Sequence, residues 1–204
     1  MGSESALWYD YKTGMSEFDY FDRLYTQIMI MSEKNWCGEK REGQTGKEFL
    51  ERIDRVDDYA PGANPARFVP SEGEWVARYD FESVEGEVVR DGGANGYDAL
   101  LHGLELVEND GGHALRLDGQ GYLSLPFDSL GYPYTAQFDL YVEENPPADS
   151  VLFHGRDGTM YLNYQGTGKI GYERKGYAYV FDYDLYPGMW HSIALSCTSS
   201  DATL

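Results

Sequence analysis

The chain has 204 residues, 42% of them hydrophobic, and a formal net charge of −19. This hydrophobic content is typical of a globular protein with one or two domains, and no apolar run approaches the ~20 residues that span a bilayer, so we expect no membrane insertion. The acidic surplus extends through both halves of the chain, and a surface of this sign repels nucleic acid, which we exclude as a partner.

Residues 6–36 predict a strand, a polar turn and an amphipathic helix. The strand covers Ala6 to Asp10. We expect the helix to begin at Ser16, whose hydroxyl can accept a hydrogen bond from a free backbone amide, with Asp19 as the capping-box acid. The buried face of this helix consists of apolar residues spaced three and four apart, namely Phe18, Phe21, Leu24, Tyr25, Ile28 and Met31.

A second helix is predicted from Thr45 to a point near Tyr59. Thr45 and Glu48 have the spacing of a capping box. We expect Trp36, between the two helices, to be a buried aromatic residue. One face of the second helix is apolar and consists of Phe49, Leu50, Ile53 and Val56.

Residues 60–73 form a predicted linker, because two prolines and a glycine at its start stop any helix. The linker separates a domain of residues 1–59 from a domain of residues 74–204. In the second domain the apolar spacing becomes alternating, in short runs about every 8 to 12 residues, which is typical of an antiparallel β-sandwich.

The predicted strands of the second domain are Trp75–Phe81, Val88–Asp91, Leu100–Val107, Ala114–Leu117, Tyr122–Leu125, Thr135–Val142, Val151–His154, Thr159–Tyr164, Lys169–Glu173, Tyr177–Tyr183 and Trp190–Cys197. Alternation assigns one set of side chains to the core, namely Ala136, Phe138, Leu140 and Val142. It assigns the side chains between them to the outside, namely Thr135, Gln137, Asp139 and Tyr141. In the last strand, two faces are again distinguished, one with His191, Ile193, Leu195 and Cys197 and the other with Trp190, Ser192, Ala194 and Ser196.

Three ordered blocks near the start resemble the last βα unit of glycoside hydrolase family 20, the β-N-acetylhexosaminidases: Ala-Leu-Trp-x-carboxylate, Asp-Arg-Leu and Met-Ser-Glu-Lys-Asn-Trp. The resemblance implies that residues 1–59 end a (β/α)8 barrel. It also implies that Trp8 walls the pocket for a terminal N-acetylhexosamine and that Asp10, where the family usually has Glu, binds sugar hydroxyls. Without the resemblance, Trp8 as a core aromatic residue and Asp10 as a turn residue are the favoured interpretation.

The resemblance further implies a substrate-assisted retaining mechanism, in which an Asp-Glu pair orients the sugar's acetamido group and protonates the leaving oxygen. That pair belongs to an earlier barrel strand and is not in this sequence. We therefore expect an upstream barrel domain of the same polypeptide as a partner. We expect the 204 residues alone to be inactive.

The second domain resembles a concanavalin-A-like, laminin-G-type jelly roll in Tyr-Asp-Phe-Glu at 79–82, the turn at 91–96, the runs at 112–119 and 121–126, and Trp-His-Ser-Ile-Ala-Leu at 190–195. The resemblance implies an extracellular or cell-surface domain that binds glycan or acts as a spacer. In this fold late strands pair with early ones. We expect the C-terminal strands of the domain to be missing from the 204 residues, which would leave an exposed edge near Trp75–Phe81.

The resemblance allows a structural calcium ion in the β-sandwich, since many domains of this type hold one, and we expect no required cofactor. Calcium takes six to eight oxygen ligands. Asp80, Asp91 and Asp118 lie at strand ends or glycine-rich turns where such a site could form. Each of them also fits an ordinary turn aspartate, and this is the favoured interpretation because no spaced calcium-loop motif is present.

Glycan binding without a metal would use exposed aromatic residues, and Tyr177, Tyr179 and Tyr183 share one face of a predicted strand. Core packing is the favoured interpretation for them, because aromatic residues are common in β cores. The sequence thus predicts the C-terminal fragment of a secreted β-N-acetylhexosaminidase that acts on terminal N-acetylhexosamine. The alternatives are a non-catalytic carbohydrate-binding or adhesion module and a spacer without a ligand.

Overall fold

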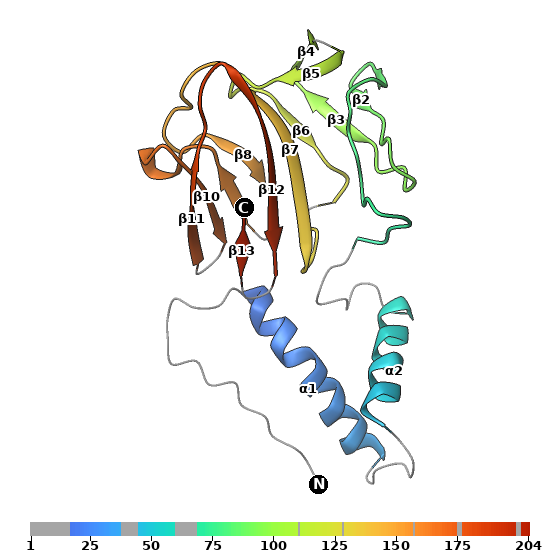
Figure 1. Cartoon of the computed structure of the whole chain (residues 1–204). Coiled ribbons are helices and arrows are strands. Elements are labelled where there is room, and N and C mark those ends of the chain that lie inside the picture. Colours follow the sequence, from blue (N-terminus) through green and yellow to red (C-terminus); the bar gives the residue numbers. More distant parts are fainter. Residues whose placement is uncertain are drawn as a thin grey trace. The chain divides into compact units, whose positions relative to one another are not determined.

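A computed structural model describes residues 17–37, 45–59, 69–109, 111–127, 129–156, 158–174, 177–198 and 201–204 (Figure 1). Within these residues the protein is mainly β, with two helices followed by short strands that pair antiparallel. The predicted mainly β, antiparallel class is therefore confirmed. The predicted strand Ala6–Asp10, which contains Trp8, and the cap at Ser16 lie outside the described residues.

The two helices are α1, Glu17–Cys37, and α2, Gly46–Tyr59. The predicted capping box of α2 is confirmed. The Thr45 amide donates to Glu48 Oε2 at 2.9 Å, and the Glu48 amide donates to the Thr45 hydroxyl at 3.3 Å. These bonds satisfy amides that have no partner within the helix, which explains why α2 begins at this point.

An ion pair joins α1 to α2, with Arg52 Nη2 at 2.6 Å from Glu33 Oε2. Ile53, the residue after Arg52, is buried. Trp36 lies in the last turn of α1 and is 92% exposed, so the expectation of a buried Trp36 is wrong. The physical reason is that burial of an aromatic ring needs a packing partner, and no described residue covers this one.

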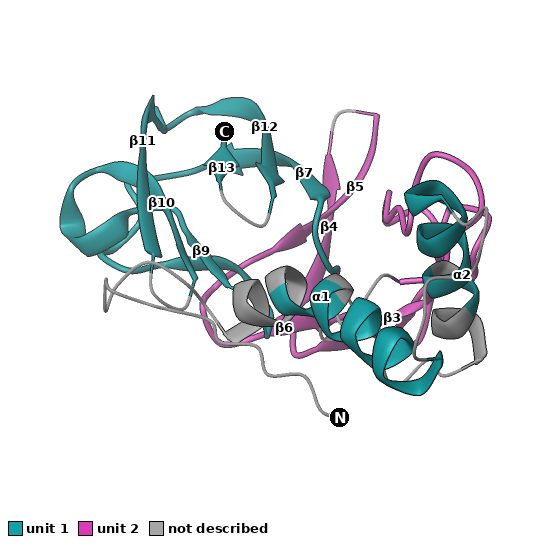
Figure 2. Cartoon of the chain, turned by 90° about the horizontal axis from the view of Figure 1, so that it is seen from below, with its two compact units in different colours: residues 1–68, 131–204 teal, residues 69–130 magenta. Residues whose placement is uncertain are grey.

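Contacts between residues divide the chain into two compact units (Figure 2). Unit 1 comprises residues 1–68 and 131–204, and unit 2 comprises residues 69–130. Unit 1 is therefore discontinuous in sequence. The domain boundaries derived from the sequence stay predictions, namely 1–59, 60–73 and 74–204.

Unit 1 contains two antiparallel sheets after residue 131. The first has the order β13-β12-β7, with β7 at Tyr134–Val142, β12 at Met189–Cys197 and β13 at Ala202–Thr203. The second has the order β11-β10-β9-β8, with β8 at Val151–His154, β9 at Thr159–Tyr161, β10 at Lys169–Arg174 and β11 at Tyr177–Asp184. A short 3-10 helix, η2, covers Tyr164–Gly166.

The alternation predicted for unit 1 is confirmed by burial. In β12 every second residue from His191 to Cys197 is buried. In β7 the residues assigned to the outside, from Thr135 to Tyr141, are exposed, and those between them are half-buried. Both sheets contribute to one core, whose fully buried members include Met160, Ile170, Tyr172, Leu195 and Cys197.

Unit 2 contains a sheet of order β1-β2-β3-β6 and the hairpin β4-β5. The sheet strands are β1 at Val84–Glu85, β2 at Val88–Val89, β3 at Ala99–His102 and β6 at Tyr122–Ser124. The hairpin strands are β4 at Glu105–Asn109 and β5 at Gly112–Arg116. Val89, Ala99 and Leu101 form a small buried core.

Residues 75–81 form no strand, so the predicted strand and the exposed edge there are both wrong. Side chains from later in the sequence bind the backbone of this segment instead. The Asn95 side-chain amide donates to the Trp75 carbonyl at 2.8 Å, and Asp91 Oδ1 accepts the Arg78 amide at 2.9 Å. A segment whose polar groups are satisfied in this way does not need a strand partner.

Two further strand predictions are corrected at turns. The predicted strand 100–107 is divided into β3 and β4 at Gly103, whose φ of 67° is incompatible with a continuous strand. The predicted strand 159–164 ends at Tyr161, because the chain enters η2. The short strand β1 was not predicted as a separate element.

Candidate functional site

Asp91, one of the predicted calcium ligands, is bound by backbone amides. Its carboxylate accepts hydrogen bonds from Arg78 at 2.9 Å, Gly93 at 2.8 Å and Tyr97 at 3.1 Å. The Asp91 amide in turn donates to Asp98 Oδ1 at 2.9 Å. Asp91 thereby ties the segment before β1 to the turn after β2.

Asp91→Asn is expected to lower the free energy of unfolding of unit 2 by about 2 kcal/mol near neutral pH, because hydrogen bonds to a charged acceptor are strong. Burial acts to raise the pKa of Asp91, but the amides of Arg78, Gly93, Tyr97 and Gly96 outweigh it and lower the pKa. The stabilisation is complete above the unfolded-state pKa of about 3.9 and is lost as pH falls through the lower folded-state pKa. Urea unfolding across this pH range should show the two proteins converging in acid. A constant difference would contradict the prediction.

Asp80 and Asp118, the other predicted calcium ligands, lie in separate turns of unit 2. Asp80 Oδ1 accepts the Glu82 amide at 3.1 Å, and Asp118 Oδ1 accepts the Gln120 amide at 2.9 Å. Each carboxylate thus stabilises its own turn. Within the described part of the chain, no group of three or more His, Cys, Asp or Glu side chains could hold a metal ion, and the calcium site stays a prediction.

The tyrosines predicted to bind glycan lie on the inward face of β11, where they are half-buried. The rings of Tyr177 and Tyr179 have centroids 5.0 Å and 5.7 Å from the guanidinium carbon of Arg174, which is 2% exposed. The Tyr183 hydroxyl lies 2.9 Å from Nδ1 of the buried His191. This placement agrees with the favoured interpretation of core packing.

A different aromatic pair is exposed on the other sheet of unit 1. Tyr141 of β7 and Trp190 of β12 lie directly opposite each other in the antiparallel register. Their ring centroids are 5.6 Å apart with 57° between the ring planes, and the residues are 49% and 46% exposed. A cross-strand contact of this kind holds both rings in place while about half of each residue faces water. We call Tyr141 and Trp190 the aromatic pair.

Polar side chains lie next to the aromatic pair on the same face. Asp139 and Ser192 form the next cross-strand pair on this face, and both are exposed. One step of two residues separates the two pairs, a distance of about 7 Å along the strands. A carboxylate and a hydroxyl at this distance can bind the hydroxyl groups of a ring that stacks on the aromatic pair.

The sequence carried a partial signal for this site. Alternation assigned Tyr141 to the outside of its strand and distinguished the face of Trp190 from that of His191. The contact between the two rings depends on the pairing of β7 with β12, which alternation does not specify.

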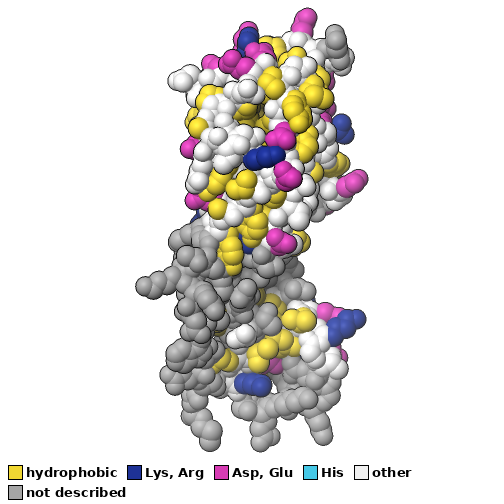
Figure 3. Space-filling model, turned by 60° about the vertical axis from the view of Figure 1, so that its left-hand side comes forward, with side chains coloured by type: hydrophobic (Ala, Val, Ile, Leu, Met, Phe, Trp, Pro, Cys, Tyr) yellow, Lys and Arg dark blue, Asp and Glu magenta, His cyan; other side chains and the backbone are white. Residues whose placement is uncertain are grey.

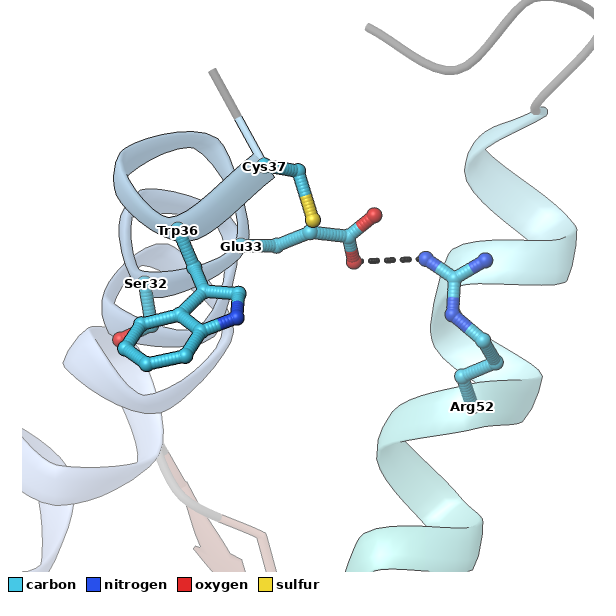
Figure 4. Close-up of a pocket in the computed structure, with 5 residues that line it drawn as sticks. All are labelled: Ser32, Glu33, Trp36, Cys37 and Arg52. Atoms are coloured by element: carbon cyan, nitrogen blue, oxygen red, sulfur yellow. Dashed lines mark hydrogen bonds and ion pairs between the residues drawn. The ribbon is translucent and has the colours of Figure 1, made fainter. Parts of the chain in front are cut away.

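A shallow hollow of about 500 Å³ lies between the end of α1 and α2, and its lining includes Ser32, Glu33, Trp36, Cys37 and Arg52 (Figure 4). Glu33 and Arg52 point toward each other across it and form the ion pair already described. Because these two charges pair with each other, the main chemical feature that the hollow presents is the exposed indole of Trp36.

Acidic and hydrophobic side chains are interspersed over one side of the β part in Figure 3, with few basic side chains among the described residues. This pattern agrees with the formal net charge of −19. Such a surface favours a neutral ligand over an anion. Neither of the described helices is long and apolar enough to cross a membrane.

The comparisons with known proteins identify no relative from which a function could be transferred. No family model matches the chain, and neither a curated protein nor a solved structure matches it significantly. Function is therefore inferred from the geometry of the described residues together with the resemblances in sequence.

Proposed function

We propose that the chain is the C-terminal part of a secreted β-N-acetylhexosaminidase and that its β part binds carbohydrate. The aromatic pair is the observation that carries this proposal. The apolar C–H face of a pyranose packs on exposed aromatic rings, and its hydroxyls donate to a neighbouring carboxylate such as Asp139. The net charge of −19 favours neutral glycans over anionic ones.

The exposed apolar residues of α1 support the barrel assignment. Trp36 and Ile28, eight residues apart on α1, are 92% and 48% exposed, and we assign them to a further packing interface. In this proposal they pack on the upstream barrel, Trp8 walls the pocket for the terminal N-acetylhexosamine, and Asp10 accepts its hydroxyls. The β part is then a concanavalin-A-like jelly roll that follows the barrel.

Trp190→Ala is expected to weaken binding of N-acetylglucosamine oligosaccharides on the order of tenfold or more. The reason is that an aromatic side chain that becomes buried under a ligand contributes about 2 kcal/mol or more to the binding free energy. Tyr186→Ala is the matched control, since Tyr186 is 61% exposed in the same unit but does not belong to the aromatic pair. Titration calorimetry on the three proteins, with unfolding midpoints checked, measures the difference. Equal loss in both variants, or no binding by the unchanged protein, would contradict the proposal.

A non-catalytic laminin-G-type binding or adhesion module is the second candidate. It is favoured by one observation, that the aromatic pair belongs entirely to β7 and β12 and uses no residue of the helical segment. Both candidates predict the same effect of Trp190→Ala. The coding sequence upstream of this chain distinguishes them, because an Asp-Glu pair on an earlier barrel strand supports the enzyme.

A further inference from the structure

The aromatic pair is one end of a longer row of paired side chains. β7 and β12 stay in unbroken antiparallel register over their whole length. The face that carries the aromatic pair therefore presents four successive cross-strand pairs, namely Tyr141–Trp190, Asp139–Ser192, Gln137–Ala194 and Thr135–Ser196. The six residue steps from Tyr141 to Thr135 span about 20 Å of antiparallel strand. We call these four pairs the β7–β12 row.

Beyond the aromatic pair the β7–β12 row is largely polar, and it is exposed except at Ser196, which is half-buried. Asp139, Gln137 and Thr135 are all exposed, and Thr135 Oγ1 lies 2.9 Å from Ser196 Oγ. In these three pairs Ala194 is the one residue whose side chain has no polar atom. A carboxylate, a primary amide and hydroxyls supply the donors and acceptors that sugar hydroxyl and acetamido groups require.

The exposed face of β11 in the other sheet of unit 1 has a different chemistry. Val180 is 52% exposed there. Lys169 Nζ pairs with Asp182 at 2.9 Å and with Asp184 at 2.7 Å. Charges that already pair with one another, next to an apolar side chain, are typical of an ordinary solvated sheet face. Of these two outward faces in unit 1, the β7–β12 row is the one that combines an exposed aromatic pair with a line of exposed polar side chains.

Resting on the proposed carbohydrate binding, we infer that the β7–β12 row binds an extended, neutral oligosaccharide. Its terminal ring stacks on the aromatic pair, and the following rings lie along Asp139, Gln137 and Thr135. Polar contacts recur at every second residue, about 7 Å apart, so the sugar chain follows the strand direction. Such a row makes affinity rise with chain length, whereas the aromatic pair alone binds one ring. The Asp139 carboxylate disfavours chains that carry carboxylates of their own.

The affinities for N-acetylglucosamine and for its linear β-1,4-linked oligomers test this inference. The unchanged protein is expected to bind the longer oligomers on the order of tenfold more tightly than the monosaccharide. The reason is that each additional sugar ring forms about one more hydrogen bond with the β7–β12 row. The variant Gln137→Ala/Thr135→Val should lose this gain and keep its monosaccharide affinity within about twofold. Asp182→Ala, on the exposed face of β11 and 99% exposed at its side chain, is the control and should change neither affinity.

The outcomes separate the inference from the proposed function. Equal affinity for all chain lengths would contradict oligosaccharide binding along the β7–β12 row, but it would agree with binding of one ring at the aromatic pair. Absence of binding to every sugar in the series would overturn both. If the double variant does not fold, backbone amide shifts in the unchanged protein decide. The Gln137 and Thr135 amides should shift with the oligomer but not with the monosaccharide, and shifts confined to the aromatic pair with both ligands would overturn the row.

Discussion

Gly121→Ala is expected to lower the free energy of unfolding of unit 2 by about 3 kcal/mol or more. A Cβ at this position would lie 2.6 Å from the Gly103 carbonyl oxygen and 2.7 Å from the His102 carbonyl oxygen. Both oxygens belong to the backbone at the end of β3 and in the turn after it. Only a shift of the chain itself can therefore relieve the clash, since no side-chain rotation moves these atoms. Close approach of two backbone segments makes glycine necessary here.

Gly92→Ala is the matched control for Gly121→Ala. Its Cβ would meet other atoms at ordinary van der Waals distances, the nearest being Asp80 Oδ2 at 3.4 Å. Urea unfolding measures the stability of both variants, and hydrogen exchange of the β3 and β6 amides localises the change. An equal effect of the two substitutions would show that the contact between Gly121 and Gly103 is not the cause.

Gly171→Ala is expected to have a similar effect on unit 1, about 3 kcal/mol, through a different contact. Gly171 lies in β10, which pairs with β9 and β11, and its Cβ would lie 2.5 Å from both Cβ and Cγ of Tyr164. Tyr164 is 8% exposed, and these two atoms stand at the root of its side chain. The position of Cβ is set by the backbone of η2, so no rotation of the Tyr164 side chain removes this contact with the added methyl group.

Gly46→Ala is the control for this second substitution. Its Cβ would meet no atom within 4 Å, and alanine is favoured over glycine in a helix such as α2. Thermal unfolding should therefore show a lower midpoint for Gly171→Ala and an unchanged or higher midpoint for Gly46→Ala. Coinciding midpoints for Gly171→Ala and the unchanged protein would refute the close packing of Tyr164 on β10.

Strands with one buried face could be predicted closely from the sequence. The predicted strand Val151–His154 has the same bounds as β8, and β7 and β12 each begin one residue earlier than predicted. β7 and β12 alternate between core and solvent, so the pattern of consecutive residues is enough to predict them. The predicted strand 75–81 failed because the groups that bind its backbone, on Asp91 and Asn95, come later in the sequence.

The arrangement of the aromatic side chains in unit 1 was only partly predictable, for a related reason. Tyr177, Tyr179 and Tyr183 were correctly placed on one face of a strand, but the sequence did not decide which face is buried. The exposed rings of Tyr141 and Trp190 are in contact because two strands distant in sequence pair in one particular register. A shift of one residue would turn one ring to the other face.

Some properties of the protein follow from its sequence alone. They are the acidic surface, the helix that begins after Thr45, and the strands whose inward and outward residues alternate. These properties depend on residues that are close in the chain, whose interactions do not change with the fold. The tertiary structure decided that β12 pairs with β7 and that Gly121 lies against Gly103. It also decided that Trp36 stays exposed. Each of these features depends on which distant segments meet, and local patterns place no constraint on that choice.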